Sequence, residues 1–248
     1  MKAVILAAGR GRRLKPLTDS LPKGLIKLEG RELLDYSLEN LSRAGIKEAL
    51  VVVGYLGEKI RKRFGKSFSG LSIRYAENKD YGSTGSMYSL SKTRGLVHEE
   101  IILLESDLVY EQKALEILLD SEASDAILVA PISGSGDEVF VLADKNGCLS
   151  NLGKKATGKE KAIGELVGIS RISAGLLDEI YARAEEEYSG GNRNQHYEEV
   201  ILRTSRKLKF PVKCLSGDIA WSEIDKEEDL IRARKVLSER IRPYTKHD

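Results

Sequence analysis

Short apolar runs alternate with helical patterns through the first 130 residues, and this alternation limits the possible folds more than any other feature of the sequence. The apolar runs cover Lys2–Leu6, Ala49–Val53, Leu71–Ala76, Ile101–Leu104 and Ala126–Ala130. Between the first two runs, Arg31–Ala44 places its leucines on one helical stripe. Strands that alternate with helices form a mostly parallel sheet with helices on both faces. Because such sheets bind ligands at the carboxyl ends of their strands, we expect the functional site there.

The second half of the sequence predicts shorter strands and an antiparallel hairpin. Glu138–Ala143 and Cys148–Leu152 flank Asn146-Gly147, a pair typical of hairpin turns. Further strands are expected over Glu165–Ile172, Val212–Leu215 and Ile219–Ile224, and helices over Ala174–Glu187, Tyr197–Lys207 and Lys226–Arg240. No repeat or low-complexity linker separates the two halves. We therefore expect one α/β domain over residues 1–240, with a mostly parallel mixed sheet and a small β-rich part, and a tail over residues 241–248.

Charge and apolar content exclude several classes of partner. Forty basic and 38 acidic residues give a net charge of +2, which argues against a nucleic-acid-binding surface. No apolar run approaches the roughly 20 residues of a membrane span, so we expect no membrane partner. The residues after Met1 do not resemble a signal peptide, and Cys148 and Cys214 are isolated from each other. These features predict a cytoplasmic location.

The loop after the first strand reads AAGRGRRLKP and covers Ala7–Pro16. Gly9 and Gly11 do not complete the dinucleotide fingerprint, because Leu14 occupies the third glycine position, and the sequence contains no P-loop motif. Glycines still let backbone N–H groups approach phosphate oxygens, and the neighbouring arginines supply positive charge. Taken alone, the loop fits either a phosphate site or a solvated turn.

Lys23 lies between Pro22, which stiffens the chain, and Gly24, which permits a close backbone approach. A lysine held in this way can neutralise charge on a phosphoryl group, although a surface lysine is the simpler interpretation of this residue by itself.

Two short strands end in aspartate. Asp107 follows the buried run Ile101–Leu104, and Asp225 follows Trp221–Ile224. Carboxylates at a sheet edge are the hard oxygen ligands that Mg²⁺ takes together with substrate phosphates. Asp225 also precedes a helix, so it fits an N-cap equally well.

Two further loops carry polar groups of undecided role. Residues 81–87 form a small-residue loop whose backbone could contact a base or an anion, or simply cap a helix. Residues 135–138 form an acidic turn that faces either a substrate cation or solvent. The three histidines are scattered and predict no catalytic or metal site.

In this order the motifs resemble a known family. Met1–Leu25 is similar to the signature of the sugar-nucleotide-type nucleotidyltransferases, which consists of a strand, a G-x-G-x-R loop and a P-K pair. The resemblance extends to about Leu230 and is closest in the cytidylyltransferase branch, to the enzymes that use 2-aminoethylphosphonate, with the phosphocholine enzymes next to them. The motifs that carry this closer resemblance are Glu77-Asn78, Ser83–Met87, Leu104–Leu108, Ser135–Val139, Gly164–Ile169 and Trp221–Asp225.

The resemblance implies a Rossmann-like nucleotidyltransferase domain that transfers CMP from CTP to a small zwitterionic phosphonate or phosphate. Lys23, Arg13 and Asp107 would be catalytic, and Asp107 and Asp225 would hold Mg²⁺. The residues that would bind the nucleotide are Leu6, Ala7, Ala8, Gly9, Gly11, Arg12, Arg13, Lys23, Ser83, Thr84, Gly85, Ser86, Glu105 and Ser106. Members of this family often form dimers, so a homodimer is possible.

The acceptor is the least determined part of the resemblance. The phosphocholine enzymes have E-W-F where this chain has Glu138-Val139-Phe140, which removes one aromatic wall for a trimethylammonium group. The candidate acceptor residues are Asp137, Glu138, Lys154, Glu165, Tyr197, Glu198 and Trp221, with Lys155 as a neighbour of Lys154. A phosphocholine or sugar-1-phosphate nucleotidyltransferase remains the alternative, and an inactive nucleotide sensor on the same fold is a third possibility.

Overall fold

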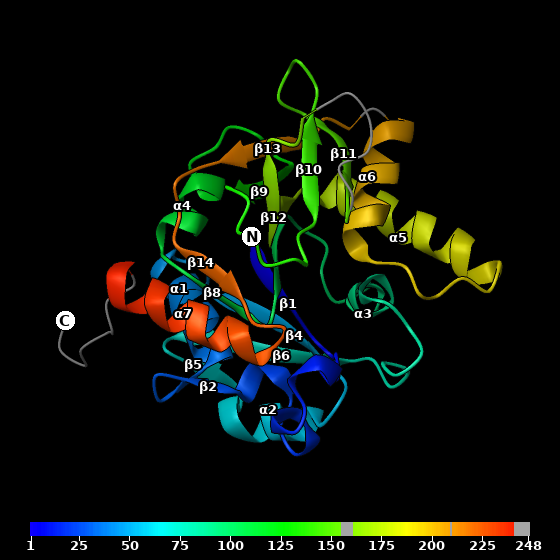
Figure 1. Ribbon diagram of the computed structural model, residues 1–248. Helices are drawn as coiled ribbons and strands as arrows, with labels where there is room; N and C mark the ends of the chain where they lie inside the picture. Colours follow the sequence, from blue (N-terminus) through cyan, green and yellow to red (C-terminus); the bar gives the residue numbers. More distant parts are fainter. Residues whose placement is uncertain (155–160, 209, 241–248) are drawn as a thin grey trace.

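The computed structural model describes residues 1–154, 161–208 and 210–240, and a ten-stranded sheet runs through its centre (Figure 1). From edge to edge the main path is β11 (Leu149–Gly153), β10 (Phe140–Ala143), β12 (Gly164–Ile172), β7 (Ile101–Glu105), β1 (Lys2–Ala7), β4 (Glu48–Val53), β6 (Leu71–Glu77) and β5 (Ser67–Phe68). Strands β7, β1, β4 and β6 are parallel, whereas β12 runs antiparallel to β7 and β10. β9 (Ala126–Ala130) pairs with β12, and β13 (Lys213–Ser216) pairs with β9. The predicted mixed sheet is confirmed.

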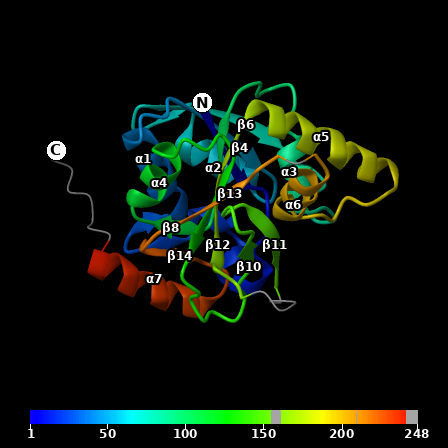
Figure 2. The same ribbon diagram turned by 90° about the horizontal axis from the view of Figure 1, so that it is seen from above.

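Helices cover both faces of the sheet, as Figure 2 shows from above. Because side chains alternate along a strand, Val4 and Ile5 point to opposite faces, and both are fully buried. Ile5 lies in one core cluster with residues of α1 (Leu33–Arg43), α2 (Gly57–Phe64) and α4 (Lys113–Leu119). Val4 packs with residues of α3 (Ser86–Ser91), α5 (Ala174–Ser189) and α6 (Tyr197–Leu208). This two-sided burial explains why the central strands read as continuous apolar runs.

A glycine bend divides β12 into two parts. Gly168 has φ +82°, and the pairing register between β12 and β9 shifts between Leu166 and Ser170. The first part of β12 pairs with β10, and the second part pairs with β7. A Cβ atom at Gly168 would lie 3.3 Å from Cδ of Glu105, so the bend also sets the space beside the end of β7. The small β-rich part thereby stands next to the carboxyl ends of the parallel strands.

The C-terminal elements form a third layer that reaches back to the start of the chain. β14 (Trp221–Glu223) pairs with β8 (Leu108–Tyr110) outside the central sheet, and α7 (Glu227–Arg240) follows it. Leu230 and Ala233 of α7 pack in one cluster with Leu14 and with Leu28 of β2 (Lys27–Leu28), the strand that pairs with β3 (Arg31–Glu32). This packing brings the turn between β14 and α7 beside the glycine loop.

The predicted hairpin is confirmed, since β10 and β11 pair antiparallel around Asn146-Gly147. The hairpin β2–β3 and the edge strand β5 were not predicted from the sequence. The tail expected at residues 241–248 lies outside the described residues. Within the described part of the chain, no helix combines the length and apolar character that crossing a membrane requires.

Candidate active site

A cleft of about 760 Å³ opens at the carboxyl ends of β1 and β7, where the parallel sheet predicts a ligand site. Two walls face each other across it. The parallel wall comes from the ends of the parallel strands and the segments that follow them. It consists of Leu6, Ala8, Gly9, Gly11, Arg12, Arg13, Lys23, Thr84, Gly85, Ser86, Glu105, Ser106 and Asp107. The antiparallel wall comes from the β-rich part and consists of Ser133, Ser135, Asp137, Glu138, Val139, Leu152, Gly153, Lys154, Glu165, Leu166 and Gly168.

The glycine loop has a left-handed turn at Gly11 and is held by the side chain of Thr18. Gly11 has φ +59°, and a Cβ atom there would lie 3.1 Å from Cγ2 of Thr18 and 3.4 Å from Cβ of Lys23. Thr18 Oγ1 donates a 2.8 Å hydrogen bond to the carbonyl of Gly11. A glycine is therefore required at position 11 for conformation and for space. A Cβ atom at Gly9 would have no neighbour within 4 Å, and Gly9 lines the cleft.

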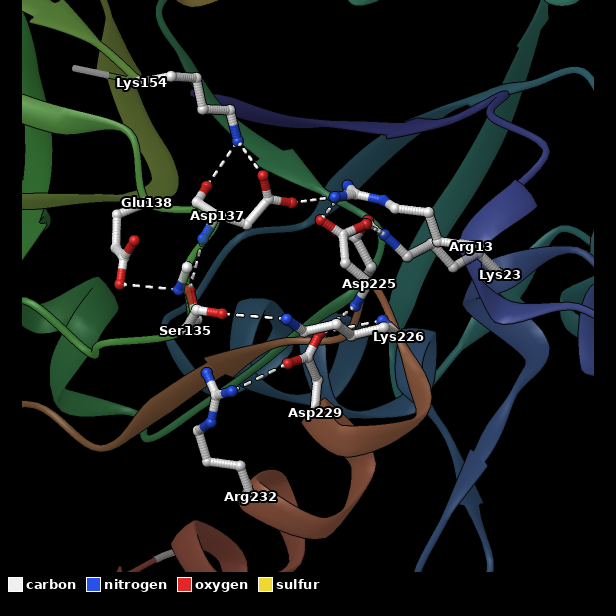
Figure 3. Close-up of polar contacts among 12 residues, drawn as sticks. Arg13, Lys23, Ser135, Asp137, Glu138, Lys154, Asp225, Lys226, Asp229 and Arg232 are labelled. Carbon is white, nitrogen blue, oxygen red and sulfur yellow. Dashed lines mark hydrogen bonds and ion pairs between the residues drawn. The ribbon is translucent and has the colours of Figure 1, made fainter.

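A chain of alternating charges crosses the cleft between the two walls (Figure 3). The ammonium of Lys23 contacts Asp107 and donates a 2.6 Å hydrogen bond to Asp225. Arg13 donates to the other oxygen of Asp225 at 2.6 Å and to Asp137. Lys154 completes the chain, because its Nζ lies 2.7 Å from Oδ1 of Asp137. Three cations and three carboxylates thus pair where a charged substrate would enter.

Lys23 is the most buried of these three cations, with 11% of its side chain exposed. Burial alone would lower the pKa of Lys23, but the charges of Asp107 and Asp225 outweigh that cost and raise the pKa above its usual value. The same contact with Lys23 overcomes burial at Asp225 and lowers the pKa of that carboxyl. Lys23 therefore carries a fixed positive charge inside the cleft at any pH at which the protein functions.

Three acidic side chains meet behind Lys23. Glu105, Asp107 and Glu223 place carboxylate oxygens within 4.8 Å of one another. Burial, followed by the charge of Asp107, raises the pKa of Glu105 to about 8. Burial, followed by the charges of Glu105 and Asp107, raises the pKa of Glu223 to about 10. The three carboxylates therefore resist being charged together unless a cation joins them.

This acidic cluster fits a divalent cation. Oδ1 of Asp107 is buried and has no hydrogen-bond partner among the described residues, and carboxylate oxygens are the ligands that hard cations take. The cluster differs from the predicted pair of Asp107 and Asp225. Glu223 joins Asp107 here, whereas Asp225 directs its oxygens to Lys23 and Arg13. The structure also differs from the interpretation of Asp225 as an N-cap. It is the carboxylate of Asp229 that accepts the N–H groups of Asp225 and Lys226, at 2.8 and 3.0 Å.

The loop at residues 81–87 is clamped by the segment before α6. The amide of Gly85 donates to the carbonyl of Arg193 at 2.8 Å, and the amide of Met87 donates to that of Gln195 at 3.1 Å. A Cβ atom at Gly85 would overlap Gln195 and lie 2.6 Å from the carbonyl carbon of Asn194. Oγ of Ser86 accepts a 3.0 Å hydrogen bond from the amide of Tyr197. These hydrogen bonds attach the loop to the segment at residues 193–197.

Three further carboxylates line the cleft, those of Glu138 and Glu165 in the antiparallel wall and that of Glu198 in α6. Glu165 is 2% exposed and accepts hydrogen bonds from the backbone and hydroxyl of Ser133 at 2.9 and 3.2 Å. Burial raises the pKa values of Glu165 and Glu198. Oε2 of Glu198 is buried with no hydrogen-bond partner in the described structure. Glu138 lies in the exposed turn, where backbone N–H groups of residues 134–138 lower the pKa of its carboxyl.

The structure brings most of the predicted site residues into one cleft. Every predicted residue lines it except Ala7, Ser83 and Tyr197. Ala7 is 4% exposed, and Tyr197, the first residue of α6, is 1% exposed because it packs in a core cluster. Ser83 directs its hydroxyl to the carbonyl of Asp80 at 3.3 Å. Lys155 lies outside the described residues.

Other cleft residues were not predicted from the sequence, among them Ser89, His196, Glu199, Glu223, Lys226, Asp229 and Arg232. A signal was available for Glu223. It lies two residues before Asp225, and residues two apart in an extended segment face the same side. The sequence carries no comparable signal for Lys226 and Arg232, because their place in the cleft depends on the packing of α7. Lys226 donates a 3.0 Å hydrogen bond to the carbonyl of Ser135, and Arg232 forms a 3.2 Å ion pair with Asp229.

Comparison with known proteins yields a family and several relatives, two of which are matched over nearly their whole length. The model of the MobA-like NTP transferase domain matches residues 3–178. A choline-phosphate cytidylyltransferase from Streptococcus pneumoniae is 36% identical over 96% of the chain and 98% of its own length. A CTP:phosphoglutamine cytidylyltransferase from Campylobacter jejuni is 27% identical over 93% of the chain and 98% of its length. A CMP-5'-(3-aminopropyl)phosphonate synthase from Streptomyces rubellomurinus is 29% identical over 92% of the chain, which spans 37% of that protein.

Solved structures have the same fold. The inositol-1-phosphate CTP transferase from T. maritima superposes with a TM-score of 0.77 over 98% of both chains, at 22% sequence identity.

Proposed function

The chain belongs to the MobA-like NTP transferase family of nucleotidyltransferases, and we propose that it is a cytidylyltransferase. In this proposal it transfers CMP from CTP to a small phosphonate or phosphate that bears an ammonium group, and its acceptor is 2-aminoethylphosphonate. The products are CMP-2-aminoethylphosphonate and pyrophosphate. An oxygen of the phosphonate attacks the α-phosphorus of CTP, and the bond to the bridging oxygen of the β-phosphate breaks.

The observation that carries this proposal is the position of Lys23. Its ammonium is held between Asp107 and Asp225, beside the glycine loop and at the carboxyl end of β7. Transfer of a nucleotidyl group requires charge neutralisation and alignment more than a covalent nucleophile. A buried, permanently charged lysine in the same cleft as the open backbone at Gly9 supplies both. An inactive sensor has no need of a cation with two buried carboxylate partners.

The parallel wall binds CTP in this proposal. Gly9, Gly11, Arg12 and Arg13 contact the triphosphate, and Leu6, Ala8 and Thr84–Ser86 enclose the base. Arg13 must then exchange Asp137 for phosphate oxygens, while Lys23 keeps its buried partners and stabilises charge at the α-phosphate. Glu105, Asp107 and Glu223 would hold Mg²⁺, which supplies charge neutralisation at the phosphates when bound.

The antiparallel wall suits the acceptor. The acceptors in the names of the three relatives are a phosphonate, phosphoglutamine and choline phosphate, and each joins a phosphorus oxyanion to a nitrogen group. Glu165 of this wall and Glu198 of α6 offer buried carboxylates to an ammonium, and Lys154 offers a cation to the phosphonate. Val139 lines the cleft at the position where the phosphocholine enzymes have tryptophan, which favours a primary ammonium over a trimethylammonium.

A pyrophosphate-release assay over a matrix of substrates tests the proposal. CTP, UTP, GTP and dTTP are each combined with 2-aminoethylphosphonate, 3-aminopropylphosphonate, phosphocholine and glucose 1-phosphate. We expect CTP with 2-aminoethylphosphonate to give the highest kcat/KM. Val139→Trp is the matched variant. It should raise kcat/KM for phosphocholine relative to kcat/KM for 2-aminoethylphosphonate, both measured with CTP. Turnover of phosphocholine without turnover of 2-aminoethylphosphonate in the unmodified protein would disprove the choice of acceptor, and absence of turnover with every pair would disprove the enzyme.

A further inference from the structure

A second cavity of about 300 Å³ lies at the end of α3, and none of its lining residues lines the cleft. α3 connects the two spaces, because Ser86 and Ser89 face the cleft while Tyr88 and Ser91 face the second cavity. Figure 1 shows α3 below α5 and α6, and α5 supplies the opposite side of the cavity through Tyr181 and Glu185. The cavity is therefore separate from the proposed catalytic site but shares a helix with it.

The lining of this cavity carries an excess of positive charge. It holds Lys92, Arg94 and Arg193 against one carboxylate, that of Glu185, and Arg94 is paired with it. Lys92 and Arg193 form no ion pair with any side chain that the structure describes. They lie over the ring of Tyr88 instead, with Nζ of Lys92 at 3.7 Å and Cζ of Arg193 at 5.5 Å from its centroid.

An aromatic face compensates a cation only in part, since such contacts contribute about 0.5–1 kcal/mol at exposed sites. Two cations on one tyrosine ring thus leave a positive potential that an anion can neutralise. Arginine and lysine together favour phosphate oxygens, to which they donate charge-assisted hydrogen bonds. The cavity has less than half the volume of the cleft, which suits a small phosphate anion such as pyrophosphate.

The same residues are connected to the loop that lines the cleft. The carbonyl of Arg193 accepts the amide of Gly85 at 2.8 Å, while its guanidinium lies over Tyr88. The hydroxyl of Tyr88 donates a 3.2 Å hydrogen bond to Asp80, which precedes the loop. An anion that draws Lys92 and Arg193 together would therefore hold α3 and the segment at 193–197 against each other, and the loop between them would lose mobility.

We propose that this cavity is a second anion site, which binds a small phosphate anion of the pyrophosphate class and rigidifies the loop at residues 83–87. The site is independent of the acceptor and of the identity of the base, so it stands whether or not CTP is the nucleotide.

Isothermal titration with pyrophosphate tests the site, and orthophosphate serves as the smaller probe. We expect the unmodified protein to bind two pyrophosphates and the variant Lys92→Ala/Arg193→Ala to bind one, at the cleft. Lys62→Ala/Lys66→Ala removes the same charge from the exposed end of α2 and its following turn, and it should keep both sites. A single site in the unmodified protein, or two sites in Lys92→Ala/Arg193→Ala, overturns the proposal. If only orthophosphate shows the second site, the cavity takes a monophosphate and the pyrophosphate assignment is wrong.

Hydrogen exchange tests the connection to the loop. Pyrophosphate should slow amide exchange at residues 83–87 more in the unmodified protein than in Lys92→Ala/Arg193→Ala, because occupation of the cleft is common to both. Equal protection in the two proteins contradicts the coupling. If the double variant fails to fold, Lys92→Gln takes its place as a milder variant that keeps part of the methylene stem. Lys92→Gln should weaken binding of pyrophosphate at the second site about tenfold.

Discussion

The two walls of the cleft are built in different ways. The parallel wall consists of backbone and buried side chains fixed by the central strands, such as Gly11, Gly85 and Lys23 with its two carboxylate partners. The antiparallel wall presents an exposed turn whose link across the cleft is an ion pair between Arg13 and Asp137, with side chains 56% and 30% exposed. A wall of the first kind suits a ligand common to a whole family, whereas the second kind can change its residues without disturbing the sheet.

The largest effect is expected at Lys23. Lys23→Ala should lower kcat by about 10³-fold or more, since loss of one preorganised donor costs about 10²–10³-fold and this one is charged. Lys15, which forms a 3.1 Å ion pair with Asp19 and is 58% exposed, gives the control Lys15→Ala with turnover near that of the unmodified protein. Steady-state pyrophosphate release measures both, with circular dichroism to verify folding. A loss below tenfold in Lys23→Ala would remove the central argument for the parallel wall.

The next test separates the roles of the two acidic side chains at the end of β14. Glu223→Gln should raise the Mg²⁺ concentration needed for half-maximal rate by at least about tenfold and abolish any Mg²⁺-induced rise in Tm. Asp225→Asn should lower turnover through Lys23 and Arg13 but keep that rise in Tm.

Thermal unfolding with and without Mg²⁺, in the presence and absence of EDTA, measures this difference. If Asp225→Asn loses the Mg²⁺ response and Glu223→Gln keeps it, the cation belongs to the pair of Asp107 and Asp225 that the sequence suggested. The acidic cluster of Glu105, Asp107 and Glu223 would then be a structural feature alone.

The contrast between the walls also explains what the sequence could predict. Gly9, Gly11, Lys23 and the end of β7 lie within contiguous motifs at strand ends, so local patterns identified them and their common edge. Tyr197 shows the limit of such patterns. It lies next to Glu198 in the chain, yet it is buried in the core while Glu198 lines the cleft.

The choice between Glu223 and Asp225 could not be made locally. It depends on Arg13 and Lys23, more than 200 residues away in the sequence, which draw Asp225 to themselves. The place of Arg232 likewise depends on how α7 packs on β8 and β14, which no motif encodes.

A moderate effect is expected where the parallel wall is tightest. Gly85→Ala should lower the free energy of unfolding by about 1–3 kcal/mol and raise KM for CTP, because the added methyl group overlaps the backbone of residues 194 and 195. Gly82→Ala is the matched control in the same loop, since a Cβ atom there has no neighbour within 4 Å. Urea unfolding compares the two variants, and equal stabilities would show that the loop is not clamped.

The smallest effect is expected at the link between the walls. Asp137→Asn removes a carboxylate from Arg13 and Lys154, and exposed ion pairs contribute about 0–1 kcal/mol, so the free energy of unfolding should change by no more than that. The kinetic effect has a definite sign. Arg13 and Lys154 no longer need to leave a carboxylate before they contact substrate, so KM for CTP should fall about two- to fivefold.

Glu138→Gln is the control. It removes the neighbouring charge, which contacts the amide of Gly136 at 3.1 Å and not Arg13, and it should leave KM for CTP unchanged. A rise in KM for CTP in Asp137→Asn would mean that Asp137 holds Arg13 in its binding position, and the two walls would then act as one unit.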